Sequence, residues 1–321
     1  MKITKFSGNF TPLNEGVLFG IDTEEEIPTD IAVEIIDVAK GEVVATQLLR
    51  NTVSATINIA PYIARMEEYA PTKHHQTTIM QAPTASYKIR VEDIESEEVV
   101  LSVNRCKVGS APTIVTSLPN SRRIAHNEND ELLIVAGKGK RIYVEMVADT
   151  GETLHLEELS SSEAIRLIIS TEDFGTNIRS FDVALYCEGE KFDSLHYTVA
   201  PTTKVATRLA WISDCGTIEQ YTFPLSHTAK RSANKQIIAT EGGVVATRCQ
   251  SKQVISLSSR YEPRATIEAI AQITSATKVW VKQGEKWDLV EVVTPHLEYN
   301  LFGEPSHLSL DVCLWQKEVM L

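Results

Sequence analysis

The sequence predicts an all-β protein of three consecutive antiparallel β-sandwich or barrel-like domains with a few short helices. Segments that alternate apolar and polar residues recur along the chain and are rich in Val, Ile, Tyr and Phe, as suits strands with one buried face. Short turns with Gly, Asn, Asp or Ser separate them, without the long helices that parallel strands require. At 321 residues, the chain is too long for a single sandwich core.

The alternating pattern predicts individual strands. It is clearest in four segments, residues 86–94, 97–106, 140–149 and 179–189. Between two such segments, residues 68–86 are polar with two prolines, which predicts a long exposed loop.

Three short segments have helical features. Pro61 stands at a first helical position in residues 60–70, and Pro263 does the same in residues 262–273, whose apolar residues recur at helical spacing. Residues 160–170 begin with a capping-box spacing and become β-branched, which predicts one helical turn that leads into a strand.

Small, proline-containing segments mark the domain boundaries. They lie at residues 106–119 and 198–208 and divide the chain into domains 1–108, 109–201 and 202–321. The third domain opens with a hairpin over residues 208–223, which turns at Gly216 and places Trp211 opposite residues 221–223.

The charge is unevenly distributed. Net charge is −12, but residues 1–201 hold 18 Lys and Arg against 31 Asp and Glu, a balance of −13, whereas residues 202–321 have a balance of +1. Such asymmetry indicates a protein partner or a solubilising surface, and the acidic part would repel nucleic acid. Because no apolar run approaches the length of a membrane span and no signal-peptide pattern begins the chain, we expect no membrane insertion and a cytoplasmic site of synthesis.

The five cysteines are predicted to be reduced and structural. Their odd number and wide spacing argue against a disulfide framework and against a zinc site, although one reactive thiol remains an alternative. Cys215 has acidic neighbours, Asp214 and Glu219, which favour the neutral thiol, so we expect a turn residue there and no nucleophile.

Few residues are candidates for a binding site. His74 and His75 hint at a metal, but adjacent residues of an extended chain point apart, so an exposed loop is the simpler reading. The acidic runs 22–26 and 126–131 lack the pattern of a calcium loop and are predicted to be solvated loops. Lys230, Arg231 and Lys235 form the one basic cluster, predicted to be an exposed loop or a subunit contact. No recognisable catalytic, cofactor or metal motif is present, so we expect a non-enzymatic protein without a cofactor.

The last third of the chain contains two aromatic hairpins. The first carries Trp211, Gly216, Tyr221 and Phe223, and the second carries Val279, Trp280, Gly284, Trp287 and Val290. A short helix lies between them and an alternating strand closes the chain. This order resembles the C-terminal part of structural proteins of tailed bacteriophages and prophages of gut Bacteroidetes. Ser213, where the family has Asn, and Cys215 before the glycine depart from that pattern.

The resemblance implies a structural protein of a tail, a baseplate or another part of a virion that is assembled in the host cytoplasm. Its expected partners are copies of itself and other virion subunits, without direct contact to nucleic acid. Two alternatives remain open. One is a carbohydrate- or surface-binding module of several β-sandwiches, with a site in loop 68–86. The other is an enzyme of unrecognised type.

Overall fold

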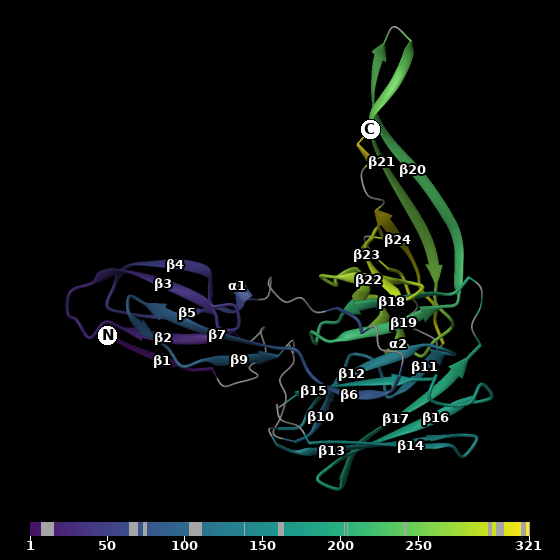
Figure 1. Cartoon of the computed structure of the whole chain (residues 1–321), viewed down its shortest axis with the longest axis horizontal. Helices are drawn as coiled ribbons and strands as arrows, with labels where there is room; N and C mark the ends of the chain where they lie inside the picture. Colours follow the sequence, from purple (N-terminus) through teal and green to yellow (C-terminus); the bar gives the residue numbers. More distant parts are fainter. Residues whose placement is uncertain are drawn as a thin grey trace.

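A computed structural model of the chain is built almost entirely of β-strands (Figure 1). It describes residues 1–7, 16–63, 70–72, 76–102, 111–137, 139–159, 164–201, 203, 205–240, 242–294, 297–299, 305–315 and 319–320. Within these ranges every strand pair is antiparallel except β11 with β17. The all-β, antiparallel fold class predicted from the sequence is therefore confirmed.

The N-terminal part is a sandwich of two sheets. One sheet has the order β1 (Lys2–Lys5), β2 (Leu18–Asp22), β5 (Ser54–Asn58). The other has the order β4 (Glu42–Thr52), β3 (Thr29–Asp37), β7 (Thr84–Val91), β8 (Ile94–Glu95), with β9 (Val99–Ser102) also paired to β7. Apolar residues of both sheets form its core, together with Ala60 and Ile63 of the short helix α1 (Ala60–Ile63).

The middle part is a second sandwich. Its five-stranded sheet has the order β11 (Ser121–Ala125), β17 (Glu190–Ala200), β16 (Ser180–Cys187), β13 (Arg141–Ala148), β14 (Thr153–Leu159). Its four-stranded sheet has the order β10 (Thr113–Val115), β12 (Asn129–Val135), β15 (Ala164–Ser170), β6 (Thr78–Gln81). Inward-facing residues of the two sheets form one apolar core.

The C-terminal part is one large sheet and a helix. The order is β19 (Ile218–Phe223), β18 (Thr207–Ile212), β22 (Val279–Gln283), β23 (Lys286–Val292), β24 (Ser309–Trp315), β21 (Gly243–Ser258), β20 (Leu225–Thr240). β25 (Val319–Met320) also pairs with β21. Helix α2 (Arg264–Ala271) continues into the 3-10 helix η1 (Gln272–Thr274) and covers one face of the sheet through Ile267 and Ile270.

Strand β6 joins the first two sandwiches in an unexpected way. It pairs with β15 of the middle sandwich, with Ile79 opposite Leu167, although the strand that follows it, β7, belongs to the N-terminal sandwich. Only Ala82 and Pro83 separate β6 from β7. The expected exposed loop over residues 68–86 is therefore wrong for residues 78–81 and 84–86, which are the strand β6 and the start of β7. The β-branched and apolar side chains of residues 78–81 complete a sheet whose other strands come much later in the sequence.

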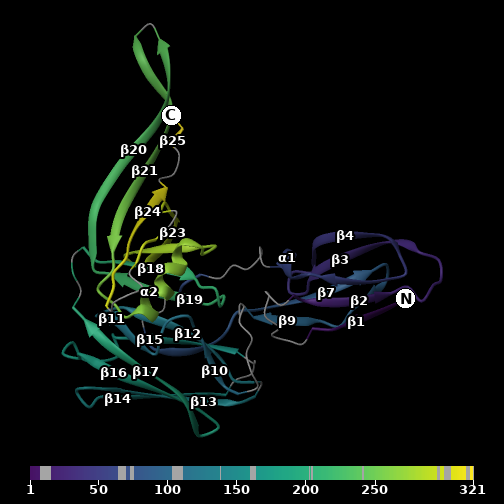
Figure 2. The same cartoon turned by 180° about the vertical axis from the view of Figure 1, so that it is seen from behind.

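The four-stranded middle sheet is buried on both faces. Leu132 and Ile134 of β12 point into the core of the middle sandwich, whereas Leu133 and Val135 point into a second apolar cluster. That cluster also contains Ala210, Ile212, Ile218 and Trp280 of the C-terminal sheet. The four-stranded middle sheet is therefore the central one of three packed layers, between the five-stranded middle sheet and the C-terminal sheet. Figure 2 shows β12 between β18 and β13.

Several local expectations agree with the structure. The two aromatic hairpins turn at Gly216 and Gly284, whose positive φ values of 79° and 59° suit glycine. The helix expected at residues 262–273 is α2 with η1. Of the helix expected at 60–70, the structure describes one turn, α1.

The register of the first hairpin differs from the expectation. Trp211 lies opposite Glu219, and Leu209 lies opposite Tyr221. The cross-strand partner of Trp211 is therefore two residues before the expected segment 221–223. Trp211 still packs with Tyr221 and Phe223 in the apolar cluster beneath α2, because residues at alternate positions share one face.

Replacement of Trp280 by Ala should destabilise the molecule. Trp280 is 5% exposed and lies between the middle and C-terminal sheets. The cavity should lower the free energy of unfolding by about 3–5 kcal/mol, as measured by urea denaturation. Its cross-strand neighbour Leu289 is 61% exposed, so Leu289→Ala is the control and should change the free energy by less than about 0.5 kcal/mol. An equally small effect of Trp280→Ala would contradict this packing.

Candidate functional site

The most prominent surface feature is a long hairpin formed by β20 and β21. Each strand has 16 residues, and the hairpin extends well beyond the rest of the C-terminal sheet (Figures 1 and 2). We call residues 225–258 the arm. Its base is held in the sheet, because residues 252–258 of β21 pair with β24. Further out, Arg248 and Cys249 pair with β25.

The basic cluster lies on this arm. The backbone of Lys230, Arg231 and Lys235 runs in β20, and the Lys230 side chain is exposed. An exposed loop is therefore the wrong description, since these residues are part of a strand paired with β21. The local sequence is rich in Ser, Ala, Lys and Asn, which are weak strand formers, so propensity alone did not indicate a strand.

One edge of the arm is open. Among the described strands, β20 pairs with β21 alone and forms the edge of its sheet. The exposed apolar side chains Leu225 and Ile237 lie on the same strand, at 46% and 63% exposure. A long open edge presents unpaired N–H and C=O groups to which another strand can bind.

Other candidate residues from the sequence do not join this feature. His74 and His75 lie outside the described residues. In the described part of the chain, no group of three His, Cys, Asp or Glu is placed to hold a metal ion. None of the described helices is long and apolar enough to cross a membrane.

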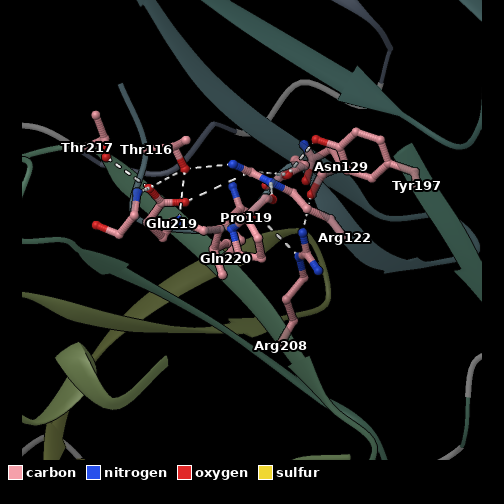
Figure 3. A network of polar contacts seen from close by, with 12 residues as sticks. Thr116, Pro119, Arg122, Asn129, Tyr197, Arg208, Thr217, Glu219 and Gln220 are labelled. Carbon is pink, nitrogen blue, oxygen red and sulfur yellow. Dashed lines mark hydrogen bonds and ion pairs between the residues drawn. The ribbon is translucent and has the colours of Figure 1, made fainter. Parts of the chain in front are cut away.

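A second candidate is a buried polar network between the middle and C-terminal parts (Figure 3). Glu219 of β19 is 1% exposed, and its Oε1 accepts hydrogen bonds from the Ser117 amide at 2.8 Å and the Thr116 hydroxyl at 2.8 Å. Thr217 donates to the same oxygen at 3.1 Å. Burial raises the pKa of Glu219, while the neighbouring Arg122 and the hydrogen bonds oppose that shift.

Arg122 of β11 is the centre of the network. Its guanidinium lies 2.8 Å from Asp130 Oδ2 and 3.9 Å from Glu219 Oε2, and it donates to Thr116 at 2.6 Å. Tyr197 donates to the same oxygen of Asp130 at 2.8 Å. Burial by itself lowers the pKa of Arg122, but its acidic partners and Tyr197 outweigh it and raise that pKa, so the guanidinium stays charged.

Arg208 of β18 forms a second polar connection between the C-terminal and middle parts. Its Nη1 lies 2.9 Å from Glu128 Oε2, and the Thr222 hydroxyl donates to that same oxygen at 2.6 Å. Its Nε donates to Gln220 at 3.0 Å, and its Nη2 donates to the Asn129 carbonyl. Arg208 therefore fastens the first strand of the C-terminal sheet to the start of β12.

These residues were missed in the sequence because the acidic run 126–131 reads as a solvated loop. In the structure Asp130 and Glu131 are 4% and 3% exposed and face Arg122 and Arg166. Their position in the sequence could have indicated burial. Both stand directly before the apolar run Leu132–Val135, which is typical of a strand buried on both faces.

A pocket of about 260 Å³ lies beside the network. Its wall includes three arginines and two acids, namely Arg122, Arg123, Arg208, Asp130 and Glu262. Each charge already has a protein counter-charge within 4.0 Å, including Arg123 and Glu262 at 3.6 Å. The network holds the two sheets together, and its charges are balanced without a ligand.

Cys215 at the tip of the first hairpin is disulfide-bonded. The expectation of reduced cysteines is therefore wrong at this position, because cysteines far apart in sequence become neighbours only after folding. Cys187 and Cys313 are free and buried, as expected, and burial raises the pKa of both thiols.

No protein-family model and no curated protein matches this chain. Among solved structures, one similar chain belongs to a complex of Dpr2 Ig1–Ig2 with DIP-Theta Ig1–Ig3, at 10% identity over 99% of this chain and 90% of that chain, with a TM-score of 0.19. Another is a tetra-tandem repeat in the extending region of a large adhesion protein, at 9% identity over 80% and 70% of the two chains, with a TM-score of 0.21. At these values neither similarity carries a functional argument.

Replacement of Glu219 by Gln should change how stability depends on pH. Because the folded state raises the pKa of Glu219, it binds that proton more tightly than the unfolded chain does. Wild-type stability should therefore fall as pH rises from the unfolded-state pKa, about 4.3, to the raised folded value. The Gln variant should lack this fall, as measured by urea unfolding at several pH values. Parallel wild-type and variant curves would contradict the prediction, and exposed Glu157→Gln is the control.

Alkylation should distinguish the cysteines. Because Cys187 and Cys313 are free but buried, they should react with iodoacetamide only after denaturation. Cys215 should require both denaturation and a reductant, because it is disulfide-bonded. Peptide mass spectrometry of protein alkylated with and without reductant measures this, and modification of Cys215 without reductant would exclude the disulfide.

Proposed function

We propose that this chain is a non-enzymatic structural subunit of a larger particle and that the arm joins it to other subunits. The observation that carries the proposal is the arm itself. It places the open 16-residue edge of β20 away from the body of the molecule, where a second chain can reach it. A paired edge of this length would supply many main-chain hydrogen bonds.

The base of the arm suits this role. β21 continues into the C-terminal sheet, which is fixed to the middle sandwich by the apolar cluster around Trp280 and by the contacts of Arg122 and Arg208. Force or torque on the arm would therefore be transmitted to two domains that move together.

The resemblance of the last third to structural proteins of tailed phages supports a virion as the type of particle that we propose. In that setting the chain would be a tail, baseplate or virion-associated component, with copies of itself and other virion proteins as partners. The arm lies between the two aromatic hairpins that carry the resemblance and contains none of their matching residues.

Shortening of the arm should prevent self-association. The variant replaces residues 233–251 by an Asn-Gly turn, which joins Ser232 to its cross-strand partner Lys252 and keeps the pairing of β21 with β24. We expect the full chain to form a defined oligomer, or to grow toward one with concentration, while the short-arm variant stays near the mass of one chain. Light scattering over a tenfold concentration range measures both.

The thermal melt of the short-arm variant is the control for its fold. If it melts like the full chain and associates equally well, the arm is not the joining element. If the full chain remains a monomer at every concentration, the self-assembly that we propose is wrong.

A further inference from the structure

The arm is the basic part of an acidic protein. Residues 225–258 hold five Lys and Arg and one acidic residue, a balance of +4 in a chain of net charge −12. Strand β20 alone carries Lys230, Arg231 and Lys235 and no acidic residue. A protruding element with this charge attracts an acidic surface over roughly 10 Å at moderate salt.

An acidic surface lies at the far end of the N-terminal sandwich. Residues 1–102 hold eight Lys and Arg against 16 Asp and Glu, a balance of −8. Seven carboxylates are exposed in the segment from β2 to β3 and in the β7–β8 turn. We call this set the acidic end, and its members are Asp22, Glu24, Glu25, Glu26, Asp30, Glu92 and Asp93.

Strand pairing brings these segments to one end of the sandwich. Asp22 pairs with Lys2 at the start of the chain, and Thr29 at the start of β3 pairs with Thr52. β7 runs antiparallel to β3, so the turn after Val91 is directed toward the same end. The N-terminal ammonium lies 2.8 Å from Glu24 and neutralises one carboxylate. Lys2 is the cross-strand partner of Asp22, and Arg90, next to the β7–β8 turn, forms ion pairs with Glu34 and Glu95.

The acidic end also has an apolar residue for contact. Ile27, in the middle of the segment from β2 to β3, is 74% exposed, more than any other large apolar side chain described. An apolar residue surrounded by carboxylates resembles the centre and rim of a protein interface.

The arm and the acidic end point away from the body of the molecule in different directions. In both views the arm projects at the top of the molecule, and the N-terminal sandwich projects to the side with its N-terminal end outermost (Figures 1 and 2). The arm therefore cannot reach the acidic end of its own chain, and a second copy must supply it.

We infer that the basic arm of one copy binds the acidic end of the N-terminal sandwich of the next copy. This inference rests on the proposed assembly function and names the two surfaces that meet. The two surfaces differ, so the contact is head-to-tail, and repetition of one such contact gives a closed ring or an open filament. Complementary charge sets which surfaces meet, and the association weakens as salt is raised.

Charge reversal tests the pairing. One variant, K230E/R231E/K235E, reverses the charge of the arm. Another, E25K/E26K/D93K, reverses the charge of the acidic end, at three exposed positions. Each alone should raise the apparent dissociation constant of self-association at least about tenfold, by light scattering at low salt. An equimolar mixture of the two should associate again, because each reversed surface then meets its opposite. E157K/E190K/E285K makes the same change of charge on the other two domains and is the control.

The outcomes separate this inference from the proposed function. Loss of association in each single variant and recovery in the mixture would establish the pairing. If the short-arm variant is monomeric but E25K/E26K/D93K associates like the wild type, the arm binds elsewhere, and only this inference fails. If the control variant weakens association as much as E25K/E26K/D93K does, general charge is responsible and the specific pairing is wrong.

Discussion

The double burial of strand β12 is the constraint on which the rest of the structure depends. Its alternate residues enter two different apolar clusters, one inside the middle sandwich and one shared with the C-terminal sheet. A strand in this position has no solvent face, so the polar residues at its start, Asp130 and Glu131, are buried as well. Burial of a charge without a partner costs several kcal/mol. Arg122 and Arg166 offset that cost, and Arg208 anchors the neighbouring Glu128.

This arrangement makes the middle and C-terminal parts one mechanical unit. Apolar packing provides most of the adhesion, since Trp280 and its neighbours exclude water from the interface. The charged contacts fix the alignment of the sheets, because each guanidinium has several acceptors at defined positions and a shift would break them together. Trp287 adds a connection to the segment before β6, since its indole N–H donates to the Thr72 carbonyl at 3.0 Å.

The N-terminal sandwich and the arm extend from this unit in two directions. β6, in the four-stranded middle sheet, is joined to β7 of the N-terminal sandwich by a two-residue link. The arm projects from the edge of the C-terminal sheet. The two extensions carry opposite charge, and the rigid unit between them keeps them apart. A chain with two complementary extremities separated by a stiff centre is suited to repeated head-to-tail contact.

The sequence by itself determined the fold class, the strands with the clearest alternation, the short helix before the second hairpin and the hairpin turns at Gly216 and Gly284. These features follow from local periodicity and from the backbone freedom of glycine, which act within a few residues. Tertiary structure decided the rest: the placement of residues 78–81 in a distant sheet, the burial of Asp130 and Glu131, the disulfide of Cys215 and the strand character of the basic cluster at Lys230. Each of these depends on a partner far away in the sequence, and local pattern carries no information about which distant residue will supply a hydrogen bond, a counter-charge or a second thiol.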